Sequence, residues 1–248
     1  VRTELAEVPF YPQQSHQCGP AALAMVLDWA GSQVTPGELA DEIYTPGREG
    51  SLQSMLVSAS RDHSRLPYVI RGSEALIRET AAGHPVVVLQ NLGLSWYPRW
   101  HYAVAIGYDL ERQLVLLRSG KVFRKRIGWS LFYRTWKRGD EWGLLVLPVN
   151  ELPESADENS YLEAVLKLEE VGKDEEASIA YKTALERWPE SLGAAMGLGN
   201  TLYAMGDLHE AEEAFRSATE LSPMCGDTYN NLAQVLAEQR RYEEALEA

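Results

Sequence analysis

Three side chains in the first half of the chain have the types that nucleophilic attack on a carbonyl group requires: Gln13, Cys18 and His101. Cys18 opens a helical pattern, and the unpaired N–H groups and positive dipole of a helix N-terminus favour a thiolate over a thiol. A thiolate becomes an effective nucleophile when an imidazole lies beside it. The amide N–H of Gln13 can stabilise the oxyanion that forms on the attacked carbonyl. These residues therefore predict thiolate–imidazolium chemistry, with His101 as the base.

The segments around these residues predict an α+β domain. Apolar residues at helical spacing predict a helix over 18–29, in which Gly19 keeps the backbone open beside the sulfur. The Thr35-Pro-Gly-Glu38 motif predicts a capping box for a helix that ends at Tyr44. Further helices are expected over 51–62 and 74–82, and strands over 85–90, 101–108, 113–118, 121–126 and 142–147. A leading helix packed on a later antiparallel sheet is an α+β arrangement.

The second half of the chain repeats with a period of 34 residues. Ala177, Ala211 and Ala245 share this offset, and so do Leu168, Leu202 and Leu236, Gly172 and Gly206, Tyr181 and Phe215, Ala184 and Ala218, and Pro189 and Pro223. A 34-residue period with small residues at helix contacts and a closing proline resembles the tetratricopeptide repeat. The resemblance covers about residues 158–248. It implies two full helix pairs and an incomplete third, stacked as an all-α superhelix that binds a peptide or protein partner.

The two halves of the chain, which has 248 residues, also differ in net charge. Of the net charge of −13, residues 1–152 contribute +1 (16 Lys and Arg against 15 Asp and Glu), and residues 153–248 contribute −14 (7 against 21). An acidic second half argues against a nucleic acid partner. Two prolines in 148–157 predict a linker, so we expect domains at 1–150 and 158–248, joined by residues 151–157.

The sequence does not indicate a transmembrane segment, a metal site or a disulfide framework. The uncharged run from Ala81 to Pro98 is too polar for a transmembrane segment. No His, Cys and carboxylate cluster has metal-ligand spacing, so neither a metal nor another cofactor is expected. Cys18 and Cys225 lie in segments of different character, which argues against a disulfide framework.

The order of motifs in the first half resembles the papain-like bacteriocin-processing peptidases, also called double-glycine peptidases. The resemblance covers about residues 8–147 and rests on three segments: Gln13-Gln-Ser-His-Gln-Cys18-Gly-Pro-Ala-Ala-Leu-Ala-Met-Val-Leu, Gly83-His-Pro-Val-Val-Val-Leu, and His101-Tyr-Ala-Val-Ala-Ile-Gly-Tyr-Asp109. It implies a papain-like fold in which Gln13 stabilises the oxyanion, Cys18 attacks and His101 is the base. It also implies cleavage of a peptide after small residues such as Gly-Gly.

The chain departs from that family at one position. Arg118-Ser119-Gly120 stands where the family usually has Asn-Asp-Pro, whose Asp orients the histidine. The Ser119 hydroxyl can accept the imidazole N–H, but it cannot stabilise an imidazolium as a carboxylate does. Asp109 or a further residue remains an alternative for this role, and Gln14 remains an alternative to Gln13 as the oxyanion donor.

Residues near His101 also suggest the substrate cleft. Trp96 and Trp100 precede the histidine and are candidates for the wall of the cleft, with packing in the core or at the rim of the sheet as the alternative. Gly19 is a further candidate for the cleft. The run Lys121, Arg124, Lys125 and Arg126 is interpreted as a solvated strand edge, with docking of an acidic substrate or of the acidic repeats as its alternative.

Three functions are consistent with these residues. The first is a cysteine peptidase whose repeats recruit the substrate or a protein partner. The second is an inactive peptide-binding scaffold, which Ser119 supports and the Cys18–His101 pair opposes. The third is an acyl transferase, in which an amine replaces water as the acceptor. The chain starts at Val1, and family habit then predicts a bacterial envelope or periplasmic location after removal of an N-terminal signal, with the cytoplasm as the alternative.

Overall fold

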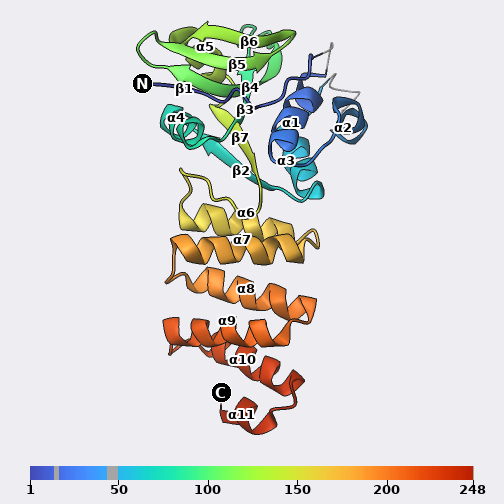
Figure 1. Cartoon of the computed structure of the whole chain (residues 1–248), viewed down its shortest axis with the longest axis vertical. Helices are drawn as coiled ribbons and strands as arrows, with labels where there is room; N and C mark the ends of the chain where they lie inside the picture. Colours follow the sequence, from blue (N-terminus) through green and yellow to red (C-terminus); the bar gives the residue numbers. More distant parts are fainter. Residues whose placement is uncertain (14–16, 44–49, 248) are drawn as a thin grey trace. The chain divides into compact units, whose positions relative to one another are not determined.

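The computed structural model describes residues 1–13, 17–43 and 50–247 (Figure 1). The chain divides into two units: Val1–Pro148 with Pro153–Ser155, and Val149–Leu152 with the residues from Ala156 onward. The first unit is α+β and the second consists of helices, which confirms the predicted fold class. Among the described residues, no helix combines the length and apolar character needed to cross a membrane.

An antiparallel sheet forms the centre of the first unit. Over the described residues its strand order is β2-β7-β3-β4-β5-β6, and β1 pairs with the end of β4. The strands are β1 (Arg2–Glu4), β2 (Leu66–Arg71), β3 (Val86–Asn91), β4 (Trp100–Asp109), β5 (Leu114–Ser119), β6 (Val122–Gly128) and β7 (Trp142–Leu147). Strands β3 and β7 are buried along their whole length. This burial on both faces explains why their sequences are continuous apolar runs rather than alternating patterns.

Helices pack on this sheet and fix the position of the candidate nucleophile. They are α1 (Cys18–Trp29), α2 (Pro36–Ile43), α3 (Gln53–Asp62), α4 (Ser73–Ala82) and α5 (Trp129–Lys137). The side chains of α1 are buried from Gly19 to Leu27, and the helix shares one apolar core with β3, β4 and β7. Because nearly every side of α1 is covered, its first residue cannot move without disturbing that core.

The capping box predicted for the second helix is confirmed. The backbone N–H of Thr35 donates to Glu38 Oε2 at 2.8 Å, and the backbone N–H of Glu38 donates to Thr35 Oγ1 at 3.3 Å. The expected end of this helix at Tyr44 lies outside the described residues.

The first unit contains three elements that the sequence did not predict: β1, β2 and α5. Strand β2 contains Pro67, which weakens a strand prediction, and it lies at an edge of the sheet, where proline is tolerated. Helix α5 is rich in aromatic residues that favour strands. Its Phe132, Thr135 and Trp136 are nevertheless buried at helical spacing, so tertiary packing overrides local preference there.

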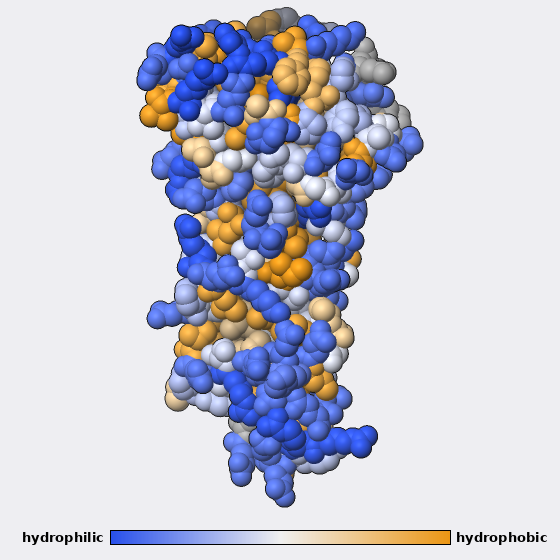
Figure 2. All heavy atoms as spheres, viewed as in Figure 1, coloured by the Kyte–Doolittle hydropathy of each residue, from blue (hydrophilic) through white to orange (hydrophobic). Residues whose placement is uncertain are grey.

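The second unit consists of consecutive helix pairs with the predicted repeat. Its helices are α6 (Glu158–Glu169), α7 (Asp174–Arg187), α8 (Leu192–Met205), α9 (Leu208–Leu221), α10 (Gly226–Glu238) and α11 (Tyr242–Glu247). Leu168, Leu202 and Leu236, which are related by the 34-residue period, are all buried. On the face shown in Figure 2, the surface over α10 and α11 is mainly hydrophilic.

Glycines allow the helices of this unit to approach closely. A Cβ added to Gly197 of α8 would lie 2.3 Å from the Tyr181 ring of α7, and one added to Gly199 would lie 2.5 Å from the Phe215 ring of α9. Both distances are far below van der Waals contact. The two aromatic rings therefore occupy the space that any larger residue of α8 would need.

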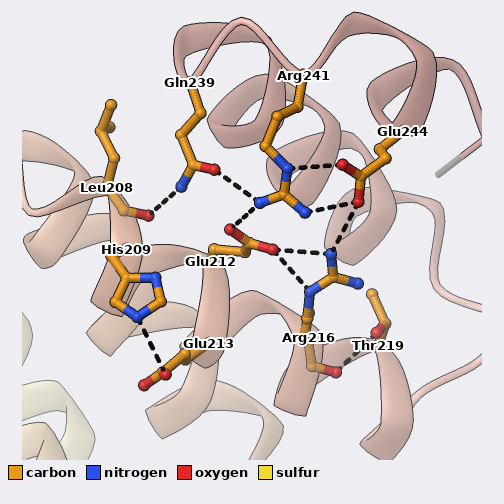
Figure 3. Close-up of polar contacts among 9 residues, drawn as sticks. All are labelled: Leu208, His209, Glu212, Glu213, Arg216, Thr219, Gln239, Arg241 and Glu244. Atoms are coloured by element: carbon orange, nitrogen blue, oxygen red, sulfur yellow. Dashed lines mark hydrogen bonds and ion pairs between the residues drawn. The ribbon is translucent and has the colours of Figure 1, made fainter.

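A buried carboxylate connects the last helices (Figure 3). Glu212 of α9 accepts hydrogen bonds from Arg216 at 2.7 Å and from Arg241 at 2.5 Å, and Arg241 also pairs with Glu244 of α11. Burial alone would raise the pKa of Glu212, but the hydrogen bonds from the two arginines outweigh it and lower the pKa. The network therefore holds the start of α11 against α9 by charge-assisted hydrogen bonds.

A second buried carboxylate lies in the first unit. Glu79 of α4 has a side chain that is 0% exposed. It accepts hydrogen bonds from His84 Nδ1 at 2.7 Å and from the backbone N–H groups of Ser155 at 2.6 Å and Glu154 at 3.2 Å. Burial raises the pKa of Glu79, but the hydrogen bonds from His84 and Ser155 outweigh burial, so that the pKa is lowered. The carboxylate thus anchors residues 153–155 to α4.

We expect Gly197→Ala to lower the free energy of unfolding of the chain by about 1 to 3 kcal/mol, because the added methyl group must displace the Tyr181 ring. Thermal unfolding followed by far-UV circular dichroism measures the effect. Gly226→Ala is the matched control, since a Cβ there meets nothing within 4 Å and alanine favours helix. Equal melting temperatures for the two variants would contradict the packing argument.

We expect Glu79→Gln to destabilise the first unit at pH 7 by about 2 to 4 kcal/mol, because it removes the charge from a buried hydrogen-bonded site. Since the folded pKa of Glu79 lies below its unfolded value, its contribution is complete above that unfolded value and is lost as the pH falls through the folded pKa. The difference between variant and parent should therefore shrink in acid.

Urea unfolding followed by tryptophan fluorescence tests the Glu79 prediction, because six of the seven Trp residues lie in the first unit. Glu74→Gln, at the exposed start of the same helix, is the matched control for charge. A difference between Glu79→Gln and the parent that stays constant from pH 7 into acid would exclude the carboxylate as its source.

Candidate active site

Cys18 is the first residue of α1, and its thiol lies against β4. The backbone of Tyr102, the residue that follows His101, lowers the pKa of the Cys18 thiol, as do the backbone groups of Gly19 and of Cys18 itself. Burial nevertheless outweighs these contacts and raises the pKa of the Cys18 thiol. The resting group is therefore a thiol, which differs from the thiolate expected from the helix N-terminus alone.

His101 lies near the start of β4 and is fixed by Ser119 at the end of β5. The ring nitrogen Nε2 lies 2.8 Å from Ser119 Oγ, which leaves Nδ1 as the other nitrogen of the ring. Ser119 is 3% exposed, so this contact is shielded from water. Burial, with a smaller contribution from the charge of Lys125, lowers the pKa of His101 to about 4. The imidazole is therefore neutral at pH 7.

Ser119 and Asp109, the two candidates for orienting His101, lie in different places. Ser119 contacts the ring, whereas Asp109 lies at the opposite end of β4, opposite Arg2 of β1. Asp109 accepts the backbone N–H of Arg112 at 3.0 Å, as expected for a residue that stabilises the turn between β4 and β5.

Gln13 is held by hydrogen bonds on both ends of its amide. Its Nε2 donates to the carbonyl of Tyr102 at 3.1 Å, and its Oε1 accepts the backbone N–H of Gly120 at 2.8 Å. The backbone N–H of Gln13 also donates to the carbonyl of Gly120 at 2.9 Å. Since Nε2 carries two hydrogens, one remains for a further acceptor. Gln14, the alternative donor, lies outside the described residues.

Arg118 positions the segment that carries Gln13. Its guanidinium is fully buried and donates to the carbonyls of Ala6 at 3.1 Å, Val8 at 2.9 Å and Phe123 at 2.6 Å. It also lies 3.9 Å from the centre of the Phe123 ring. These contacts join the N-terminal segment to β5 and β6 beside Ser119.

A cleft of about 1900 Å³ contains Gln13, Cys18 and His101 among its lining residues. Trp100 is among the residues that line it, whereas Gly19 and Trp96 are not. Gly19 packs under Ser51, whose Oγ would lie 2.7 Å from an added Cβ, and the Trp96 side chain is 81% exposed.

Sequence reasoning did not identify several residues of this cleft. The backbone carbonyl of Tyr102 and the backbone of Gly120 orient Gln13, and Ser51 covers Gly19. The sequence offers no local signal for these contacts, because they join segments far apart in the chain. Among the described residues, no cluster of His, Cys, Asp and Glu is arranged to hold a metal ion.

Comparison with known families supports this architecture. Residues 5–121 match the model of the Peptidase_C39 like family, and residues 196–248 match the tetratricopeptide repeat. A search of curated proteins finds no significant match.

Solved structures are similar to parts of the chain. A putative C39-like peptidase from Bacillus anthracis is similar at 20% identity with a TM-score of 0.50, over 59% of this chain and 98% of that one. The peptidase domain of Streptococcus ComA, a bifunctional ABC transporter, is similar at 20% identity and a TM-score of 0.47, over 57% and 98%. YrrB, a tetratricopeptide protein with an unusual peptide-binding site, is 28% identical with a TM-score of 0.35, over 36% and 46%.

The two family matches assign the C39-like domain and the repeats, and the similarity to the Bacillus anthracis structure supports the fold of the first unit. The chain therefore combines a Peptidase C39-like domain with tetratricopeptide repeats.

Proposed function

We propose that the first unit is a cysteine peptidase that hydrolyses peptide bonds and that the repeats recruit its substrate or a protein partner. The observation that carries this proposal is the convergence of Gln13, Cys18 and His101 on one cleft. Cys18 opens α1 and is affected by the backbone of Tyr102, the residue of β4 that follows His101, so that α1 and β4 bring the nucleophile and the base to the same cleft.

The neutral state of both groups favours general-base catalysis. In the proposed reaction, the imidazole of His101 removes the proton from the Cys18 thiol as the sulfur attacks the peptide carbonyl. The second Nε2 hydrogen of Gln13 and the backbone N–H of Cys18 stabilise the oxyanion. His101 then protonates the leaving amine, and water, deprotonated by the same ring, hydrolyses the thioester. Ser119 is a positioning residue, since it contacts only His101 in this sequence of steps.

The kinship with the double-glycine peptidases supports small residues, such as Gly-Gly, on the amino side of the scissile bond. Peptides that contain Gly-Gly are therefore the first substrates to examine.

A second candidate function is peptide binding without cleavage. The observation that favours it is the combination of a buried thiol, a buried imidazole and Ser119 in place of a carboxylate. No negative charge at Ser119 stabilises an imidazolium, so each proton transfer to His101 costs more than in a site with a carboxylate.

We expect Cys18→Ala and His101→Ala each to lower kcat/KM on a quenched Gly-Gly peptide by at least about a thousandfold, because they remove the nucleophile and the base. Cys225→Ser, which removes the other thiol, should retain the parent activity. Hydrolysis that persists in Cys18→Ala would exclude Cys18 as the nucleophile. A parent protein that binds such peptides but never cleaves them would favour the scaffold.

The pH profile tests the state of His101. Because a neutral imidazole is required and its pKa is about 4, kcat/KM should rise near pH 4 and stay level from about pH 6 to 8. Ser119→Asp places a carboxylate beside Nε2 and should move this acid limb upward by about 1 to 3 pH units. Ser119→Ala should lower kcat and leave the limb in place.

Ser130→Asp, on the exposed start of α5, is the matched control for the added charge. A profile that is the same in the parent and in Ser119→Asp would mean that Ser119 does not govern His101. A parent limb near pH 6.5 would mean that the imidazole is not held neutral by burial.

A further inference from the structure

Most of the charged side chains that line the cleft with Cys18 and His101 are cations. Among the described residues, these charged side chains are Arg71, Arg99, Lys121, Arg138 and Asp140. The cations come from separate segments: the end of β2, the β3–β4 loop, the β5–β6 turn and the residue after α5. The positive charge is therefore distributed around the cleft rather than along one strand edge.

Few of these charges are neutralised. Arg71 pairs with Asp140. Arg138 donates to the carbonyl of Gly93 at 2.6 Å, which satisfies one N–H group but leaves the charge uncompensated. The side chains of Arg99 and Lys121 make no ion pair or hydrogen bond within the described part of the chain. Four cations against one carboxylate leave an excess of three positive charges.

The backbone beneath Arg99 is held in a fixed conformation. Asn91 Oδ1 accepts the backbone N–H groups of Gly93 and Arg99, both at 2.9 Å, and the backbone N–H of Leu92 donates to the carbonyl of Arg99 at 2.9 Å. The same loop supplies Gly93 as the acceptor for Arg138. The loop thus holds the backbone of Arg99 and the guanidinium of Arg138, which lowers the entropic cost of pairing these residues with a ligand.

This local charge opposes the charge of the chain, which is −13. Lys125, near His101, adds to the positive field. A concave site lined by one sign of charge concentrates field lines and attracts the opposite charge. Arginine also matches a carboxylate with two parallel hydrogen bonds.

We propose that the cleft selects acidic peptides, in which Asp or Glu side chains that flank the scissile bond pair with Arg99, Lys121 and Arg138. This inference rests on the proposed peptidase function and specifies its substrate class. A neutral peptide recognised by Trp100 alone is the competing outcome.

Binding to the Cys18→Ala variant separates charge selection from catalysis. Three peptides share a Gly-Gly-Ala core, carry a neutral dye and differ only in flanking Glu, Gln or Lys residues. At about 0.05 M salt, fluorescence anisotropy should give a Kd for the Glu peptide about five- to tenfold below that for the Gln peptide, and the Lys peptide should bind most weakly. At about 0.5 M salt, screening should remove most of this difference.

Charge reversal supplies the second arm of the test. Arg99→Glu with Lys121→Glu, in the Cys18→Ala background, should reverse the order, so that the Lys peptide binds best. Arg126→Glu with Lys137→Glu changes the net charge equally at positions outside the cleft and should leave the order intact. Equal Kd values for the Glu and Gln peptides, or an equal response to both double variants, would overturn the proposal. Displacement of the Glu peptide by a short single-stranded oligonucleotide would assign the cations to phosphates and would overturn it as well.

Hydrolysis assays on the protein with Cys18 intact test the peptidase function separately from the selectivity for acidic peptides. Cleavage of all three peptides at similar rates would retain the peptidase and reject the acidic selectivity. Selective binding of the Glu peptide without cleavage of any peptide would reject the peptidase and retain the charge selectivity of the cleft.

Discussion

The buried guanidinium of Arg118 is the constraint on which the geometry of the candidate site depends. A buried cation is tolerated only when its N–H groups are hydrogen bonded, and here the acceptors are backbone carbonyls of the N-terminal segment and of β6. Neither segment can separate from β5 without leaving that charge unsatisfied. Gln13 follows the N-terminal segment and Ser119 follows Arg118, so one interaction positions both the candidate oxyanion donor and the residue that holds His101.

Strand β4 then brings the parts of the site together. Its His101 supplies the candidate base, while the backbone of the next residue, Tyr102, contacts both the Cys18 sulfur and the Gln13 amide. The pairing of Val104 with Arg118 fixes the register that places Ser119 beside the His101 ring. A slip of one residue would turn alternate side chains to the opposite face and separate this pair. The register of two strands is therefore as important to the site as the identity of its residues.

The sequence predicts the parts of this protein that depend on local patterns. Helical spacing, the Thr35–Glu38 capping box and the 34-residue period predict elements that the structure contains, because each signal lies within a short stretch of chain. The charge state of the site is not predictable in this way. The position of Cys18 at a helix start favours a thiolate, but burial by distant segments reverses the direction of the pKa shift. The sequence likewise does not show that members of the basic run after Gly120 have different surroundings. In the structure, Arg124 pairs with Glu4, whereas Lys121 lines the cleft.

Burial keeps His101 neutral, the charge of Lys125 adds to this effect, and Ser119 offers no negative charge to offset either. The cations that line the cleft produce a positive field of the same sign as the charge of Lys125. A bound peptide with carboxylates would offset part of the field and make His101 a stronger base in the complex than in the free protein. An acidic substrate would therefore supply, during binding, part of the negative charge that a carboxylate at position 119 would provide permanently.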